Sequence, residues 1–97
     1  MDVKNNILKM WSYLSDAFEM EEIEAAFENA IEGYVFDKEN MTPEAINALP
    51  DEEAKALFFD MGYAALNELF GGDWGTWGEV LQYSLEFDED TIDFLNF

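Results

Sequence analysis

The chain has 97 residues, carries 23 aspartates and glutamates against four lysines, and has a formal net charge of -19. It contains no histidine, arginine or cysteine, which excludes disulfide frameworks, thiolate or imidazole metal sites and thiol or imidazole catalysis. Because 49% of the residues are hydrophobic and 16% are aromatic, the chain is not a disordered acidic tail, and its length suits one domain over residues 1–97.

Apolar residues recur at spacings of three and four along the first third of the chain, which predicts amphipathic helices. The first helix is predicted over residues 2–17 or 2–18. The second is predicted over about residues 21–32, with Gly33 as its C-terminal stop. A break near residues 16–20 separates the two helices, and one continuous long helix is the alternative.

The middle of the chain contains clear start and stop signals. Residues 34–37 are β-prone, but a lone strand would have no partner, so a packed loop is predicted. The Thr-Pro pair at 42–43 is typical of a helix start and predicts a short helix to about Ala48. A longer helix is predicted from an acidic cap at residues 51–53 to the glycine pair at 71–72.

The last quarter of the chain begins with a glycine-rich run, residues 71–78, which predicts a loop. Thr76 and Glu79 are three apart, which suggests a capping box for the helix that follows. The acidic residues 88–90 interrupt the pattern, and a last short helix is predicted over about residues 90–96. We therefore expect an all-α fold, a small single-domain bundle of four to six amphipathic helices with an acidic surface.

The acidic face of the second predicted helix is the main candidate for partner binding. Its glutamates at 21, 24, 28 and 32 step by three and four residues, so their Cβ atoms lie roughly 5–6 Å apart on one face. With neighbouring acids, the candidate residues are Asp16, Glu19, Glu21, Glu22, Glu24, Glu28, Glu32, Asp37 and Glu39. An ordinary solvated helix face is the alternative. It is weakened because ordinary surfaces mix both charge signs, whereas all the predicted polar faces here are acidic.

A second acidic cluster lies near the C-terminus and is a further candidate for partner binding, with helix capping as the alternative interpretation. Its members are Glu86, Asp88, Glu89, Asp90 and Asp93. Trp74 is either a core residue or an exposed anchor for a partner, whereas Trp77 falls on a helical stripe and is predicted to be core. Two pairs of phenylalanines are candidates for the seam of a homodimer, namely Phe58 with Phe59 and Phe94 with Phe97.

No enzyme activity, cofactor or metal site is predicted. The glycine-rich run does not follow a strand and lacks the P-loop pattern. Asp88, Asp90 and Asp93 lack the glycine and the glutamate that an EF-hand loop requires. Direct nucleic-acid binding is not expected either, since four lysines cannot neutralise a phosphate backbone. The expected partner is instead a basic nucleic-acid-binding protein, whose groove would attract a rigid array of anions.

In size, acidity, helical pattern and aromatic content the whole chain resembles the DNA-mimic inhibitors of phages and mobile elements, namely antirestriction proteins and acidic anti-CRISPR proteins. The resemblance involves no shared motif. It implies a stoichiometric inhibitor that blocks the basic DNA- or RNA-binding groove of a defence nuclease or a CRISPR-Cas complex. Because no apolar run of 18 residues and no signal peptide is recognisable, no membrane association is expected, and the expected location is the cytoplasm, in a bacterial host if the chain is phage-encoded.

Two other classes of protein share some of these properties. Bacteriocin immunity proteins are also small, acidic and helical and bind basic nucleases, so an immunity protein or antitoxin against a basic toxin is an alternative. A non-inhibitory acidic adaptor is another. Acyl carrier proteins are excluded, because Ser84 lies in the middle of a predicted helix without the preceding aspartate that marks their phosphopantetheine serine.

Overall fold

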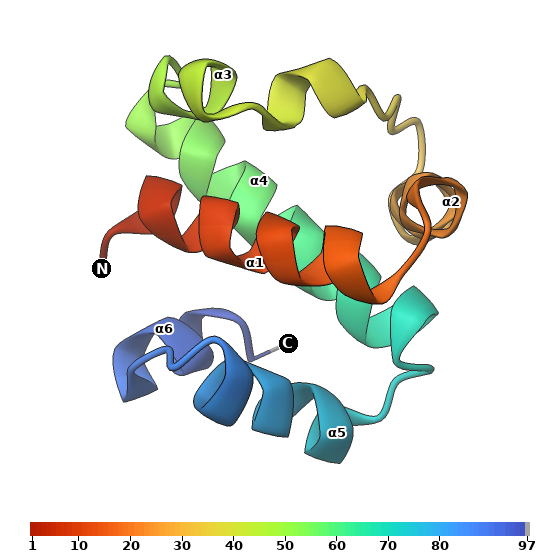
Figure 1. Cartoon of the computed structure of the whole chain (residues 1–97), viewed down its shortest axis with the longest axis vertical. Coiled ribbons are helices and arrows are strands. Elements are labelled where there is room, and N and C mark those ends of the chain that lie inside the picture. Colours follow the sequence, from red (N-terminus) through yellow and green to blue (C-terminus); the bar gives the residue numbers. More distant parts are fainter. Residues whose placement is uncertain (97) are drawn as a thin grey trace.

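The computed structural model describes residues 1–96, which form helices joined by short segments and contain no strand (Figure 1). The α-helices are α1 (Val3–Ala17), α2 (Met20–Ala30), α3 (Pro43–Asn47), α4 (Asp51–Ala64), α5 (Trp74–Glu79) and α6 (Glu89–Phe94). A 3-10 turn, η1 (Lys38–Met41), precedes α3, and two π-helical segments, η2 (Ala65–Leu69) and η3 (Val80–Ser84), extend α4 and α5. The predicted all-α fold is confirmed.

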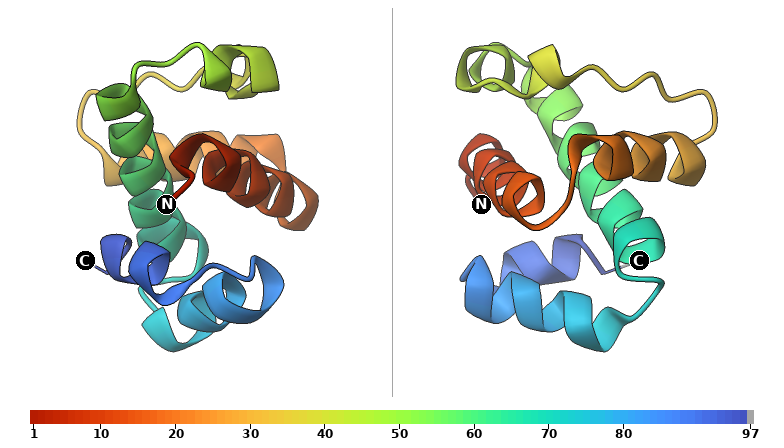
Figure 2. Two further views of the ribbon diagram at one scale, coloured as in Figure 1. Left: turned by 90° about the vertical axis from the view of Figure 1, so that its left-hand side faces the viewer. Right: turned by 45° about the vertical axis from the view of Figure 1, so that its right-hand side comes forward.

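The helices are arranged around α1 and α4, which pack against each other (Figure 1). The segment from η1 to α3 covers one end of this pair, and α5, η3 and α6 form a layer beneath it (Figure 2). Helix α2 stands at the side and packs on α4 and η2. The break between α1 and α2 falls at Phe18, whose extended backbone ends α1, so the alternative of one continuous helix is wrong.

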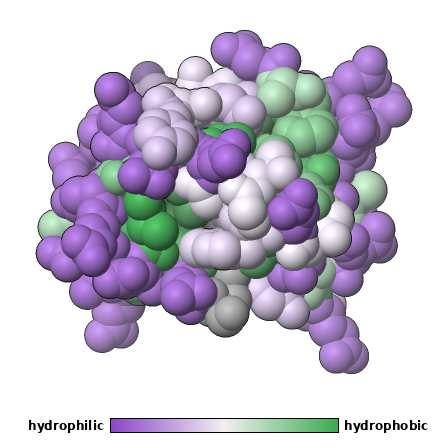
Figure 3. All heavy atoms as spheres, turned by 90° about the horizontal axis from the view of Figure 1, so that it is seen from below, coloured by the Kyte–Doolittle hydropathy of each residue, from purple (hydrophilic) through white to green (hydrophobic). Residues whose placement is uncertain are grey.

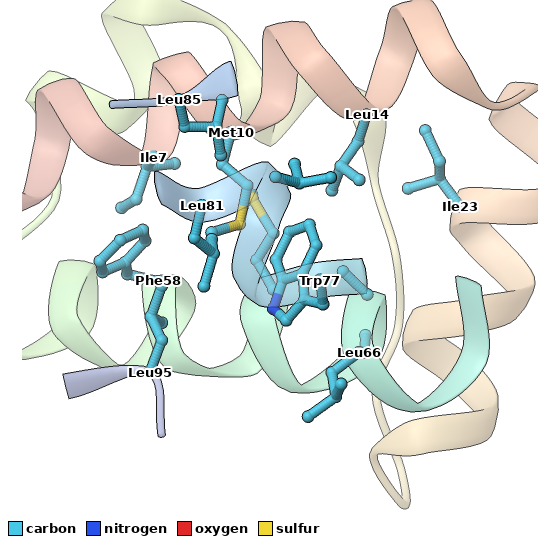
Figure 4. Packing of buried hydrophobic residues seen from close by; sticks show 14 of the residues in the cluster. Ile7, Met10, Leu14, Ile23, Phe58, Leu66, Trp77, Leu81, Leu85 and Leu95 are labelled. Atoms are coloured by element: carbon cyan, nitrogen blue, oxygen red, sulfur yellow. The ribbon is translucent and has the colours of Figure 1, made fainter. Parts of the chain in front are cut away.

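The core lies between α1, α4 and the lower layer, as the apolar stripes predicted (Figure 4). Met10 and Leu14 of α1, Phe58 of α4 and Trp77 of α5 each expose 1% or less of their surface. Burying a side chain of this size contributes roughly 1.5–3 kcal/mol. Trp77 is the largest of them and lies between α1 and α4, which confirms its predicted place in the core.

The two π-helical segments end the helical runs that begin with α4 and α5 in the same way. The N–H of Phe70 donates to the carbonyl of Ala65 at 2.9 Å, and that of Leu85 donates to Val80 at 2.9 Å. Each bond spans five residues, which widens the last turn. After the first segment the chain reverses through Gly71–Gly72, whose φ angles of 62° and 79° lie in the left-handed region. That conformation favours glycine and explains why the pair ends the helix as predicted.

Some predicted helix starts are confirmed. Asp2 caps α1 by accepting a hydrogen bond from the N–H of Asn5 at 3.2 Å, and Thr42 caps α3 by accepting one from the N–H of Ala45 at 3.2 Å. The predicted carboxylate cap of α4 is wrong. Pro50 occupies the cap position and Asp51 is the first helical residue, so the acids of this first turn act only through the helix dipole.

The predicted loop over residues 71–78 is wrong in its second half, because α5 begins at Trp74. Its cap is Asp73, which accepts from the N–H of Thr76 at 3.2 Å and from its hydroxyl at 2.7 Å. The predicted capping box of Thr76 and Glu79 is therefore wrong as well. Asp73 accepts hydrogen bonds from both donors of Thr76. The helix therefore begins three residues earlier than predicted.

Candidate functional site

The outer face of α2 carries three exposed glutamates, Glu21, Glu24 and Glu28, which we call the α2 ridge. They occupy an arc of about 60° on the helix surface and span about 10.5 Å along the axis. The opposite face buries Ile23 and Phe27, which expose 1% or less. The ridge is thus held in place by the packing behind it, and no lysine lies between Lys9 and Lys38 to interrupt it.

Behind the ridge, aromatic rings fix the position of α2. The ring of Phe27 stacks on Tyr34 with centroids 5.0 Å apart and contacts Phe36 at 5.3 Å. Tyr34 therefore packs on α2 from a loop. The loop predicted over residues 34–37 is confirmed.

The prediction that Glu32 shares the helix face of the α2 ridge is wrong. Helix α2 ends at Ala30, and Ile31 adopts an extended backbone with φ of -125°. Gly33 follows with φ of 77°, which turns the chain toward the core. Since Glu32 lies beyond the last helical residue, it cannot follow Glu28 by a regular helical step, although it remains exposed.

The acids at or before the start of α2 that are not part of the α2 ridge have local roles or lie elsewhere. Glu22 accepts a hydrogen bond from the N–H of Glu19 at 3.2 Å, so these two exposed residues stabilise the start of α2. Asp16 lies in the last turn of α1 and lines a shallow groove shared with Ser84 and Leu85. It therefore borders the lower layer rather than extending the ridge.

The acids that follow α2 in sequence belong to the loop and to η1. Asp37 caps η1 by accepting from the N–H of Glu39 at 2.9 Å. Glu39 lines a groove that also contains Trp11 and Met20, the first residue of α2. The structure thus places Glu39 near the start of α2, whereas Asp37 lines a different groove between this loop and α4.

The C-terminal acidic segment consists of Glu86, Asp88, Glu89, Asp90 and Asp93, all of which are exposed. Figure 1 places α6 on the opposite side of the molecule from α2, so the two predicted acidic clusters do not form one continuous surface. Seen from below, the layer of α5 and α6 shows hydrophilic side chains around a paler centre (Figure 3).

Several acids of this segment have roles in the fold. Asp88 caps α6 by accepting from the N–H of Thr91 at 2.8 Å, and α6 begins at Glu89 rather than at the predicted Asp90. Hydrogen bonding from the Thr91 side chain, and then from its N–H, holds the pKa of Asp88 below its usual value. Glu89 and Asp90 lie in the first turn, where negative charge is favourable. Helix capping, the alternative interpretation of this cluster, therefore accounts for much of its charge.

The aromatic candidates separate into core and surface residues. Trp74 is half-buried and packs against the core, so it exposes only part of its ring. Phe58 is completely buried, which makes its predicted place in a dimer seam wrong. Phe59 is 39% exposed, stacks on Tyr63 and contacts Phe94 edge-on. Phe97, also predicted for the seam, lies outside the described residues.

The charge of the surface is not neutralised by ion pairs. Every acidic residue except Asp60 is exposed. Among residues 1–96, no lysine nitrogen lies within 4.0 Å of a carboxylate oxygen. Lys4 donates instead to the carbonyl of Asn47 at 3.0 Å, and Lys9 lies 5.8 Å from the ring centre of Phe87. The acidic surface therefore presents nearly its full negative charge to a partner.

Sequence reasoning missed Asp60, the one acidic residue that is partly buried. It lies on α4 and lines a groove of about 410 Å³ together with Tyr34 and Leu57. Burial raises the pKa of Asp60. A signal was available in the sequence, since Asp60 is the only acid within the largely apolar stretch 54–67.

Comparison with known proteins places no constraint on the function of the chain. No known protein family, no curated protein and no solved structure matches it. Within residues 1–96, no three acidic side chains are grouped so that they could hold a metal ion. None of the helices in this described part has the length and apolar character needed to cross a membrane.

Proposed function

We propose that the protein is a stoichiometric inhibitor that occupies the basic nucleic-acid-binding groove of another protein, such as a defence nuclease or a CRISPR-Cas complex. In this proposal its carboxylates occupy the positions in the groove that the phosphates of the nucleic acid would otherwise occupy. The observation that carries the proposal is the uncompensated charge: 22 of the 23 acids are exposed, because Asp60 alone is not, and none of those in residues 1–96 is paired with a lysine.

The spacing of the α2 ridge fits this role. Its neighbouring Cβ atoms lie roughly 5–6 Å apart, whereas a DNA strand carries one phosphate about every 3.4 Å of axis. The ridge of about 10.5 Å therefore spans about three phosphate steps of one strand, so its three carboxylates lie along a length that carries about four phosphates. Glu39 lies near the start of α2, where Lys38 lines the same groove and offsets its charge, so the array consists of the ridge itself. A groove of lysines and arginines that follows a phosphate backbone would attract such an array.

Repulsion between ridge glutamates destabilises α2, which supports a role for them in partner binding. Like charges at positions 24 and 28 destabilise a helix by roughly 0.2–0.5 kcal/mol. Glu24 and Glu28 accept no hydrogen bond in the described part of the chain, so they do not offset that cost by capping or pairing, whereas Glu21 lies in the first turn, where the helix dipole favours it. A role for the ridge in recognition explains why repelling side chains are placed together.

The proposed mechanism is competition, not catalysis. The chain offers no histidine, cysteine or arginine, and the carboxylates of the ridge are exposed to solvent. Association would be fast and sensitive to salt, because long-range attraction between opposite charges increases the rate of encounter. At high ionic strength this attraction is screened and binding weakens.

The proposal is tested by affinity capture from a lysate of the native host at low salt, followed by a salt gradient. We expect one nucleic-acid-binding enzyme or complex to be retained, and to be displaced by its own DNA or RNA. Recovery of a small toxin encoded beside this protein would replace the proposal with an immunity function. A partner that keeps its nucleic-acid affinity in the complex would indicate an adaptor.

A further inference from the structure

The groove around Asp60 lies between the loop that follows α2, helix α3 and helix α4. Its volume is about 410 Å³. Apolar side chains, including Leu49 and Leu57, form much of its lining, and Tyr34 contributes an aromatic ring. A groove of this kind suits a ligand with an apolar portion and a few placed polar groups.

Carboxylates line this groove from both sides. On α4, Glu53 and Asp60 lie seven residues apart, so they share a face and are separated by about 10.5 Å along the helix. Leu57 lies between them on that face. Asp37 lines the opposite side, from the start of η1. The groove therefore combines an apolar middle with negative charge at its margins.

Asp60 is the least solvated of these carboxylates. Apart from its electrostatic effect on Tyr34, it has no hydrogen-bond or ion-pair partner among residues 1–96. Its burial raises its pKa, and the pKa of the Tyr34 hydroxyl is raised by burial and then by the nearby charge of Asp60. No lysine lines the groove. A cation that enters would therefore relieve an unpaired, partly desolvated negative charge.

We propose that this groove receives an arginine side chain of the basic partner, with the guanidinium at Asp60 and the alkyl stem along Leu57. This proposal rests on the proposed function, because the arginine belongs to the same basic partner. Arginine fits better than lysine, since its planar guanidinium is weakly hydrated, pairs with carboxylates through two hydrogen bonds and stacks on aromatic rings. An anion would be repelled, and a purely apolar ligand would leave Asp60 unpaired.

The groove can be tested on the isolated protein with n-butylguanidinium as the probe, at physiological salt and followed by NMR. We expect saturable shifts that centre on Tyr34, Leu57 and Asp60, and weaker shifts with unsubstituted guanidinium, which lacks the stem. Asp60→Asn should weaken binding about three- to tenfold. The matched control is Glu68→Gln, which makes the same change in charge at an exposed position outside the groove and should bind as the wild type does.

Non-saturating shifts spread over the whole acidic surface, equal in Asp60→Asn and Glu68→Gln, would overturn the proposal. A thermal melt shows that each variant is folded, and Asp60→Asn is expected to fold because it removes a partly buried charge. With the captured partner, equal affinity of the wild type and Asp60→Asn would reject the arginine site and leave the inhibitor function intact. Loss of affinity in Asp60→Asn without any competition by nucleic acid would support the site and reject the mimicry.

Discussion

Three glutamates of the α2 ridge and five acids of the C-terminal acidic segment are all exposed, but they differ in what they do for the fold. In the C-terminal segment, Asp88 caps α6, and its neighbours Glu89 and Asp90 complement the positive end of the helix. In the ridge, Glu21 lies in the first turn of α2 and is favoured in the same way, whereas Glu24 and Glu28 repel each other one turn apart and cap nothing. Charge that stabilises a helix end needs no partner to explain it, whereas charge that destabilises a helix does.

The two acidic regions also differ in their position on the molecule. Helix α2 and helix α6 lie on opposite sides of the molecule (Figure 1). One groove in a partner would therefore contact either the ridge or the C-terminal segment, unless it wrapped around the whole protein. We assign the contact to the ridge, and evidence that the C-terminal acidic segment makes this contact would overturn the assignment.

The largest expected effect is on partner binding. Glu24→Lys with Glu28→Lys should weaken binding to the captured partner by at least about tenfold, mainly through slower association. The matched control is Glu86→Lys with Asp93→Lys, which makes the same change in net charge in the other region. We expect the control to weaken binding by less than about threefold, since its effect acts only through the long-range field.

Surface plasmon resonance at two salt concentrations separates these effects, because a purely long-range contribution decreases strongly as salt rises. Equal losses in the two double variants would show that net charge alone determines binding. A greater loss of affinity in the control would show that the binding surface lies on the C-terminal acidic segment.

The next effect concerns stability and is expected in the other region. Asp88→Ala should lower the Tm by a few degrees, because it removes the acceptor that caps α6. Glu28→Ala, on the ridge, should leave the Tm unchanged or slightly higher. Thermal unfolding followed by circular dichroism measures both. A larger loss in Glu28→Ala would mean that the ridge has a structural role after all.

The stabilising effect of Asp88 should depend on pH in a defined direction. Because its pKa is lowered in the folded state, the ionised carboxylate stabilises the fold above its unfolded pKa of about 3.9. The stabilisation is lost as the pH falls through the lower folded value. The Tm difference between wild type and Asp88→Ala should thus be constant near pH 7 and shrink below about pH 4. A difference that grows on acidification would contradict the capping role.

The smallest expected effect is a slight gain in stability from neutralising the ridge. Glu24→Gln with Glu28→Gln removes one repulsive pair and should stabilise the fold by roughly 0.2–0.5 kcal/mol at low salt. The gain should disappear at high ionic strength, where the repulsion is already screened. Urea titrations at both salt concentrations measure it, and a loss of stability would show that these carboxylates have favourable contacts.

The sequence predicted the elements whose signals are local. The stripe of α1 and the Thr-Pro start of α3 follow from the spacing of side chains and from capping chemistry, and both are confirmed. The end of α2 was predicted at residue 32 because Gly33 suggested a C-terminal stop, whereas the helix ends at Ala30 and Ile31 is already extended. Tyr34 packs on Phe27 from the loop, a contact that the spacing of apolar residues does not distinguish from a helical one.

Other features depend on which segments the fold brings together. The cap at Asp73 was missed because the surrounding glycines favoured a loop. The five-residue hydrogen bonds that end α4 and α5 have no recognisable sequence pattern. The groove at Asp60 is formed by the loop, α3 and α4, which follow one another in the chain but enclose a groove only after the chain has folded back along α4. The acidic candidates were identified from composition, but their division into two opposite faces was not predictable from it.

We expect the partner to bind either this protein or its nucleic acid but not both, and an equilibrium competition shows whether binding is exclusive. The affinity of the protein for the captured partner is measured by titration calorimetry at increasing concentrations of the nucleic acid that the partner binds. We predict that the apparent Kd rises in proportion to the free nucleic acid, without a plateau. An apparent Kd that is unchanged, or that reaches a plateau while a ternary complex forms, would contradict this expectation.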